Sequence, residues 1–274
     1  HRATKSVRPF DMRRKAPPLR VKLRVLLWKH GDVKENEMKK VMRVMVGLVA
    51  LMSLMAVSQA AEEDYAVWAK RMPITFSGYQ PPGGGAPLTN FPVLVVLSES
   101  EAGAGFSYSD FLSPPYGDLR FTADERETPL DFEVESWDVE GDSHIWVKVP
   151  ELTAETTIYA LWGKAGVDMP ECTTNGAVWS EGFAAVWHMD DAATGAQDST
   201  ANGNHAVETT DVVAVDGVSS GAGNFNGNTS FIDIGSNNTL EPEHITFSAW
   251  IKVTGSGTHE DGNYVITKGR SGSV

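Results

Sequence analysis

The chain has 274 residues, with 23 Lys or Arg and 36 Asp or Glu, and a formal net charge of −13. Residues 1–60 carry 14 of the basic and 4 of the acidic side chains, which leaves 9 basic and 32 acidic side chains, a charge of −23, for residues 61–274. Nucleic-acid affinity comes largely from Lys and Arg that displace counterions, so a segment this acidic excludes nucleic acid as a partner.

The basic front of the chain predicts an export signal. Met38-Lys39-Lys40 opens a cationic stretch, the 14-residue apolar run 44–57 follows, and Ser58-Gln59-Ala60 places small residues before a cleavage site. We therefore expect a signal peptide over residues 38–60. The alternative is a membrane anchor, but spanning a bilayer takes roughly 20 apolar residues. Residues 1–37 are rich in Arg, Lys and Pro without apolar periodicity, and we expect a disordered or spurious leader there.

The rest of the chain has the pattern of an all-β protein, because short or alternating apolar runs are separated by Gly, Asn, Asp and Pro. The single cysteine, Cys172, cannot form an internal disulfide, so stability must come from core packing. The expected strands, in chain order, are Met72–Phe76, Phe91–Leu97, Leu119–Thr122, Leu130–Trp137, His144–Val149, Thr156–Trp162, Ala184–His188, Gly223–Phe225, Phe231–Ile234, Ile245–Val253 and Tyr264–Lys268.

A change of composition divides these strands into two groups. Glu, Pro and β-branched residues are common before residue 163, whereas Asn, Gly, Ser and Asp dominate after residue 180. We expect one β-domain over residues 61–165, a linker over residues 166–178, and a second β-domain over residues 179–274.

The blocks Leu88–Val95, Asp118–Thr122, Leu130–Asp138, Ile145–Pro150 and Ile158–Gly163 together resemble a bacterial exported domain family of unknown function, DUF2341. The resemblance covers about a hundred residues. It implies a β-sandwich in surface or secreted proteins, commonly followed by a laminin-G-like module, and it implies no known reaction.

Two acids in the first domain have a spacing that permits chemistry. Strand alternation places Asp131, Glu133 and Glu135 on one face, with Glu133 and Glu135 about 7 Å apart. Glycoside hydrolysis uses two carboxyl groups about 5–10 Å apart. A solvated strand face explains the same residues, and no nearby His, Arg or Tyr is placed to raise the pKa of one acid. We therefore assign no catalytic residue.

Several aromatic residues and histidines allow two interpretations. Trp137, Trp146 and Trp162 suit either sugar stacking or a core, and their position in apolar runs favours the core. His188 and His205 lack the ligand spacing of a zinc site. For His188, beside an apolar run, a hydrogen-bonded core histidine is the favoured interpretation.

The second group of strands resembles a laminin-G-like, concanavalin A-like module. The blocks that carry this resemblance are Ala185–Asp191, Asp198–Ala206, Gly223–Gly227, Phe231–Gly235 and Ile245–Lys252. The resemblance implies a jelly roll of two antiparallel sheets that binds glycans or proteins, sometimes with calcium. Such modules are longer than the segment after residue 178, so we expect a partial jelly roll.

One loop of this module is a candidate calcium site. Residues 198–203 place oxygen-bearing side chains at positions 1, 3 and 5 and Gly at position 6, as in the first half of an EF-hand loop. Position 12 is not the required Glu, so the loop is not an EF-hand. We expect Asp198, Asn202 and Asn204, with Asp190, to hold calcium in a β-loop; a turn-rich connection is the alternative.

The sequence thus predicts an all-β protein, a β-sandwich followed by a partial concanavalin A-like jelly roll. We expect a bacterial, secreted or cell-surface, non-catalytic protein that binds polysaccharide or a surface protein. Membrane contact is expected only through the signal or a segment beyond Val274. A polysaccharide-degrading enzyme and the extracytoplasmic part of a proton-channel-type biopolymer-transport protein are the alternatives. No particular oligomeric state is indicated.

Overall fold

The computed structural model describes residues 63–81, 83, 85–100, 105–123, 127–255 and 264–268. The expected leader, residues 1–37, and signal peptide, residues 38–60, lie outside the described residues. Within the described ranges, no helix has the length and apolar character needed to cross a membrane.

The described part of the chain consists of strands joined by loops and single turns of 3-10 helix. The strands are β1 (Lys70–Thr75), β2 (Leu88–Ser98), β3 (Arg120–Thr122), β4 (Phe132–Ser136), β5 (Asp142–Leu152), β6 (Thr157–Trp162), β7 (Glu208–Thr210), β8 (Val213–Asp216), β9 (Gly221–Asn224) and β10 (Phe231–Asp233). The 3-10 turns are η1 (Tyr65–Val67), η3 (Tyr108–Asp110), η4 (Glu171–Thr173), η5 (Ala177–Trp179) and η6 (Asn238–Leu240).

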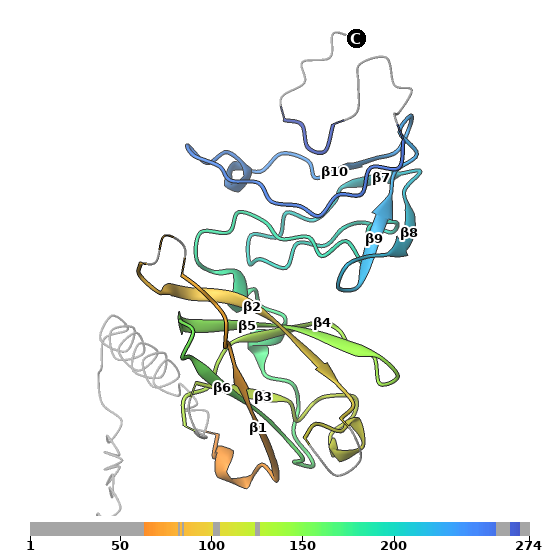
Figure 1. Ribbon diagram of the computed structural model, residues 1–274. Coiled ribbons are helices and arrows are strands. Elements are labelled where there is room, and N and C mark those ends of the chain that lie inside the picture. The colour runs from red at the N-terminus through yellow and green to blue at the C-terminus, as the bar shows by residue number, and fades with distance from the viewer. Residues whose placement is uncertain are drawn as a thin grey trace, which may run out of the picture. The chain divides into compact units, whose positions relative to one another are not determined.

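Two three-stranded antiparallel sheets form a β-sandwich. One has the strand order β1-β6-β3 and the other the order β2-β5-β4 (Figure 1). A single cluster of buried side chains contains residues from both sheets, including Phe121, Phe132, Ile145, Val147 and Ile158. Removing each such side chain from water contributes roughly 1.5–3 kcal/mol, which explains why the sheets pack face to face. The expected all-β sandwich is confirmed.

Strand alternation sets which side chains leave the core. In β5, Ile145, Val147 and Val149 are buried in the sandwich, whereas Trp146 and Lys148 point to the other face of the sheet. In β4, Phe132 and Val134 pack in the core, so Glu133 and Glu135 share that outer face with Trp146. The outer face of the β2-β5-β4 sheet is therefore unusually polar and aromatic.

A buried aspartate fixes the loop before β3 to the end of β6. Asp118 has no exposed surface, and its carboxylate accepts backbone N–H groups from Leu112 and Ser113 on one side and from Gly163 and Lys164 on the other, at 2.8–3.2 Å. Four donors satisfy both oxygens of a buried charge. This contact ties the loop before β3 to the chain just after β6.

After β6 the chain stays in contact with the sandwich. Met169 and Cys172 pack against the core cluster, and Thr173 is buried. Residues 177–220, which we call the cover segment, then contact the outer face of the β2-β5-β4 sheet. Lys148 of β5 donates to the carbonyl of Ala177 and the hydroxyl of Ser180, at 3.2 and 2.7 Å.

The described part of residues 179–274 contains two two-stranded antiparallel sheets, β8-β9 and β10-β7. β10 matches the expected strand Phe231–Ile234, β9 overlaps the expected strand Gly223–Phe225 at Gly223 and Asn224, and β7 and β8 were not expected. The jelly roll stays a prediction.

One expected strand, 184–188, is absent because a neighbouring loop satisfies its backbone groups. The N–H of Val186 donates to the Asp198 carboxylate, and the carbonyl of Ala184 accepts from the side-chain amides of Asn202 and Asn204. These bonds take the groups that a strand would use to pair with a neighbour.

The expected strands 245–253 and 264–268 are also absent. No strand among the described residues pairs with either segment. Residues 245–253 keep an alternating apolar pattern, yet their side chains are exposed, and Trp250 is 88% exposed. The prediction of these two strands is wrong for the described residues, because a strand forms only beside a hydrogen-bonding partner.

Candidate functional site

The acids of β4 lie under the cover segment, and the interpretation of this face as a solvated strand face is wrong. The Glu133 side chain is 17% exposed and the Glu135 side chain 2% exposed. Two neighbouring carboxylates that lose water in this way need donors or positive charge close by.

The cover segment supplies those donors. Glu135 accepts hydrogen bonds from the hydroxyls of Ser219 and Ser220, at 2.7 and 2.8 Å, and from the indole of Trp146, at 2.6 Å. Glu133 accepts from Ser199 Oγ at 2.7 Å and from Trp179 Nε1. Except for Trp146, all these donors lie at least 46 residues along the chain from the acid they contact.

His188 bridges the two acids. Its Nε2 lies 3.4 Å from Glu133 Oε1, and its Nδ1 lies 3.4 Å from Glu135 Oε2. At these lengths the contacts are ion pairs rather than well-aligned hydrogen bonds. The imidazole stacks on Trp146 with the ring planes 22° apart and also contacts Trp179. We call Glu133, His188 and Glu135 the Glu–His–Glu cluster.

The charges in the cluster support one another. Burial by itself lowers the pKa of His188, but the contact with Glu133 and the charges of Glu133, Glu135 and Asp190 outweigh it, so the pKa lies above its ordinary value. Burial likewise raises the pKa of Glu135, but the Ser219 hydrogen bond, the His188 charge and the bonds from Ser220 and Trp146 reverse this, so its pKa is lowered. The two shifts favour the protonated form of His188 and the ionised form of Glu135.

One acid of the pair does not suit the role of general acid in glycoside hydrolysis. A general acid needs a raised pKa and access to the leaving oxygen. Glu135 has a lowered pKa and almost no exposed surface. The two acids therefore have the spacing of a hydrolytic pair but the environment of an internal ion-pair network.

The tryptophans divide between the core and this face. Trp162 is buried in the sandwich core and Trp137 packs against it, as expected. Trp146 lies instead on the outer face of the sheet, 5.1 Å from the Trp179 ring, measured between ring centroids. None of the three presents an open platform to a sugar, because each packs against protein.

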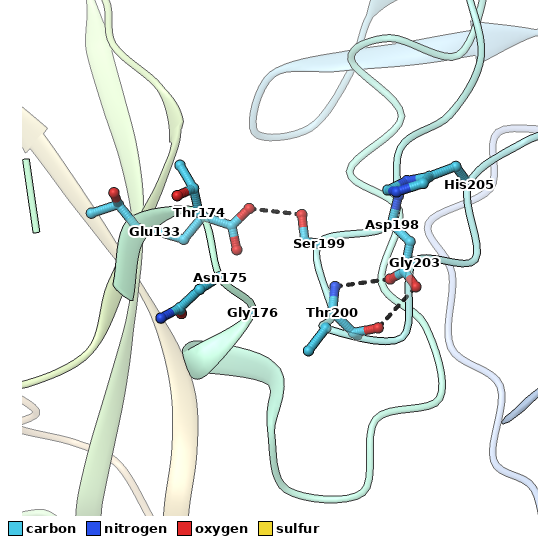
Figure 2. A pocket seen from close by; sticks show the side chains of 11 residues that line it. Glu133, Thr174, Asn175, Gly176, Asp198, Ser199, Thr200, Gly203 and His205 are labelled. Atoms are coloured by element: carbon cyan, nitrogen blue, oxygen red, sulfur yellow. Dashed lines mark hydrogen bonds between the residues drawn. The ribbon is translucent and has the colours of Figure 1, made fainter. Parts of the chain in front are cut away.

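A cavity of about 420 Å³ lies next to the cluster. Its wall is lined by Glu133, residues 173–176, residues 198–201, Gly203 and His205. Figure 2 shows Glu133 on one side and the 198–205 loop on the other, joined by the Ser199–Glu133 hydrogen bond. The lining offers hydroxyls, a carboxamide and carboxylates but no aromatic ring apart from the imidazole of His205.

Asp198 organises the loop that forms one side of this cavity. Its Oδ1 accepts the N–H groups of Val186 and Thr200, and its Oδ2 accepts Thr200 Oγ1 and the N–H of Asn204, all at 2.8–3.0 Å. The N–H of Asp198 donates to Nδ1 of His205 at 3.0 Å. A neutral His205 therefore carries its proton on Nε2, which becomes a donor.

The structure brings three of the four predicted calcium ligands together in one loop, but as hydrogen-bonding groups. Asn202 donates to the carbonyls of Phe183 and Ala184, and Asn204 donates to Ala184 and Thr239. In the ranges that the structure describes, no group of three or more His, Cys, Asp or Glu is placed to hold a metal ion.

Asp190, the fourth predicted ligand, lies close enough for its charge to act on His188. Both oxygens of Asp198 are already occupied by two donors each, so calcium binding there would have to replace some of these bonds. Calcium at this loop stays a prediction.

Sequence reasoning missed His188, Ser199, Ser219 and Ser220 as partners of the β4 acids. A signal was present, because the apolar run that ends at Trp187-His188, within a turn-rich stretch, indicates a segment that covers another surface. A strand face with two carboxylates is one surface that a histidine can cover without leaving charge unpaired.

Comparison with known families agrees with part of the sequence-based resemblance. Residues 115–202 match the family model DUF2341, a domain of unknown function. No curated protein and no solved structure matches the chain. The matched range runs from the loop before β3 through the cluster, including Trp179, His188 and Ser199.

Proposed function

We propose that the chain is an exported, non-catalytic binding protein, located outside the cell or on its surface, that recognises polysaccharide at the cavity beside Glu133. The observation that carries the proposal is the lining of that cavity. A volume of about 420 Å³ falls within the range of small-ligand sites, roughly 300–1,000 Å³. Hydroxyl, carboxamide and carboxylate groups match the hydroxyls of a sugar, which both donate and accept hydrogen bonds.

One further point supports binding over hydrolysis. The acid with the lowest exposure, Glu135, is held by four partners and has a lowered pKa. Export rests on the signal pattern before residue 61, and a laminin-G-like origin of residues 179–274 rests on the sequence resemblance. Calcium bound at the 198–204 loop belongs to the same proposal.

Binding is tested with the purified chain on a glycan array and by calorimetry with each glycan that it retains. The change Ala201→Tyr places a bulky ring at an exposed position of the cavity wall, and we expect at least about tenfold weaker binding. The matched control is Ala214→Tyr, because Ala214 is an exposed alanine of β8 outside the cavity. Equal affinity of both variants, or capture of surface proteins and no glycan, would contradict the proposal.

A glycoside hydrolase is the second candidate, since Glu133 lies at the cavity and Glu135 lies two residues away. It requires release of reducing sugar by the parent chain. Loss of that release in Glu133→Gln would favour the enzyme, whereas no release by the parent, or release unchanged in Glu133→Gln, would remove this pair of acids from consideration.

A further inference from the structure

The cavity beside Glu133 presents carboxylates and no cationic side chain. In the part of the chain that the structure describes, its lining combines hydroxyl, carboxamide and carboxylate groups with the imidazole of His205, and it contains no Lys or Arg. Nδ1 of His205 accepts the N–H of Asp198 at 3.0 Å, so this nitrogen cannot carry a proton while that bond is made. His205 therefore gives the cavity a neutral N–H donor and no charge.

Glu133 is the acid of the lining that can accept a further donor. A carboxylate has about four acceptor positions, and those of Asp198 are all taken. In Glu133, Oε1 accepts from Ser199 and lies 3.4 Å from His188. Oε2 accepts from the indole of Trp179, which is its one donor among the described residues, so a position on Oε2 is left for a ligand. Figure 2 shows the carboxylate pointing from β4 towards the 198–205 loop.

Negative charge is in excess around this position. The acids that line the cavity or act by charge on His188 are Glu133, Glu135, Asp190, Asp191 and Asp198. His188 contributes at most one positive charge against them, and calcium in the 198–204 loop would still leave the sum negative. Lys148 of β5 is engaged elsewhere, within 4.0 Å of Asp131 and of Glu181. An anionic ligand is therefore repelled here, whereas a cationic one is attracted.

We infer that the polysaccharide bound at this cavity carries protonated primary amines, as de-N-acetylated amino sugars do, and that one ammonium group donates to Oε2 of Glu133. This inference rests on the proposed function, because it names the class of glycan that the cavity takes. A hydrogen bond from an ammonium to a carboxylate is roughly twice as strong as one between neutral groups.

The rest of the lining favours a sugar over a lysine side chain as the source of the ammonium. Asn175 accepts the N–H of Ala177 through Oδ1, which leaves its NH₂ group, together with Nε2–H of His205, as donors to sugar hydroxyls. A lysine carries its ammonium on a long apolar stem. In the described lining the one apolar side chain is that of Ala201, so such a stem finds little apolar surface.

Calorimetry of the full chain with oligosaccharides of equal length tests the inference. The probes are oligomers of glucosamine, N-acetylglucosamine, glucose and galacturonate, measured at about pH 6, below the ordinary pKa of an α-amino group. We expect the glucosamine oligomer to bind about tenfold more tightly than the N-acetylated and glucose oligomers, a factor that corresponds to about 1.4 kcal/mol. The galacturonate oligomer is expected to bind most weakly, and the order is the same with a chelator or with calcium.

The change Glu133→Gln removes the charge and keeps the size of the side chain. Its carbonyl can accept from Trp179, and its NH₂ group can donate to the hydroxyl of Ser199. We expect the preference for glucosamine over N-acetylglucosamine to disappear. Glu155→Gln is the matched control, because Glu155 is an exposed acid between β5 and β6, outside the cavity, and this variant keeps the preference.

If Glu133→Gln does not fold, the cavity variant described above decides. Ala201→Tyr must lose the tight binding of the glucosamine oligomer, and Ala214→Tyr must keep it. The same loss in both of these variants, or equal weakening by Glu133→Gln and Glu155→Gln, would show general attraction to an acidic surface and would overturn the inference.

The remaining outcomes separate this inference from the proposed function. Equal binding of the glucosamine and N-acetylglucosamine oligomers, or a preference for galacturonate, contradicts the inference and leaves glycan binding standing. Binding of polylysine without binding of any glycan contradicts both.

Discussion

Asp198 gives the most direct test of how the cavity loop is built, through the change Asp198→Asn. The carboxylate has four donors, two on each oxygen, and is 6% exposed. An amide keeps one oxygen and replaces the other with an NH₂ group. If NH₂ takes the place of Oδ1, it faces two backbone N–H groups; if it takes the place of Oδ2, it faces one backbone N–H and the rotatable hydroxyl of Thr200.

The second orientation costs less, because the hydroxyl of Thr200 can turn and accept. The backbone N–H of Asn204 then loses its acceptor. The remaining hydrogen bonds to residue 198 are no longer made to a charged group. A lost hydrogen bond to a charged group costs about 1.5–3 kcal/mol, so a total near 3 kcal/mol is expected. For a unit of 150–250 residues this lowers the melting temperature by about 6–12 °C.

Thermal unfolding followed by circular dichroism measures the change, with Asp216→Asn as the control, because Asp216 is an exposed acid of β8. A calcium titration of the same proteins tests the metal prediction. Calcium at 100 times its dissociation constant would add about 2.7 kcal/mol to the parent and little to Asp198→Asn. A melting temperature of Asp198→Asn that lies within roughly 1–2 °C of the parent's would be the result of an ordinary surface change. That result would refute the reasoning about the loop.

Two further predictions concern other buried acids. In Asp118→Asn the NH₂ group costs least in place of Oδ1, where it faces only the N–H of Ser113, so we expect a loss of about 3 kcal/mol in urea unfolding, similar to Asp198→Asn; a loss below about 1 kcal/mol would contradict this. The pKa of Glu135 is lowered, so the stability that its carboxylate adds is complete above the ordinary glutamate pKa and is lost as the pH falls through the folded pKa. We therefore expect the free energy of unfolding to decline when it is measured from about pH 6 downward, and we expect a smaller decline in Glu135→Gln.

The sandwich strands could be predicted from sequence because each is encoded locally. Alternation in β5 places Ile145, Val147 and Val149 on one face, and the same alternation in β4 separates Phe132 from Glu133. A period of two residues is readable without knowledge of the partner strand. The edges moved by a few residues at most, as for β2, which extends from Leu88 rather than Phe91.

Prediction failed where pairing depends on distant residues. Residues 245–253 have the alternation of a strand but no partner among the described residues, whereas β7 and β8 are short and carry a weak apolar pattern. In the 198–204 loop the residue types were right, but the donors that occupy Asp198 come partly from Val186, which was expected in a strand. Local pattern identifies groups able to bond and does not identify their partners.

The acids of β4 show most clearly that a local sequence pattern does not identify the partners of a residue. Glu133 and Glu135 were recognised as a pair by spacing, and their meaning depends on His188, more than fifty residues later. With solvent in place of the cover segment, the pair would be an ordinary polar strand face. With the cover segment in place, the same two carboxylates need donors or positive charge close by, and the cover segment supplies His188 and three serines.

This requirement also gives a physical reason for the extent of the family match. A match confined to the sandwich strands would end near β6, at Trp162, yet it continues to residue 202. The added stretch contains Trp179, His188 and Ser199, which between them contact every oxygen of Glu133 that has a partner and one oxygen of Glu135. Since buried carboxylates are costly without such partners, β4 and the cover segment form one electrostatic unit, and the matched range includes β4 and the first part of the cover segment.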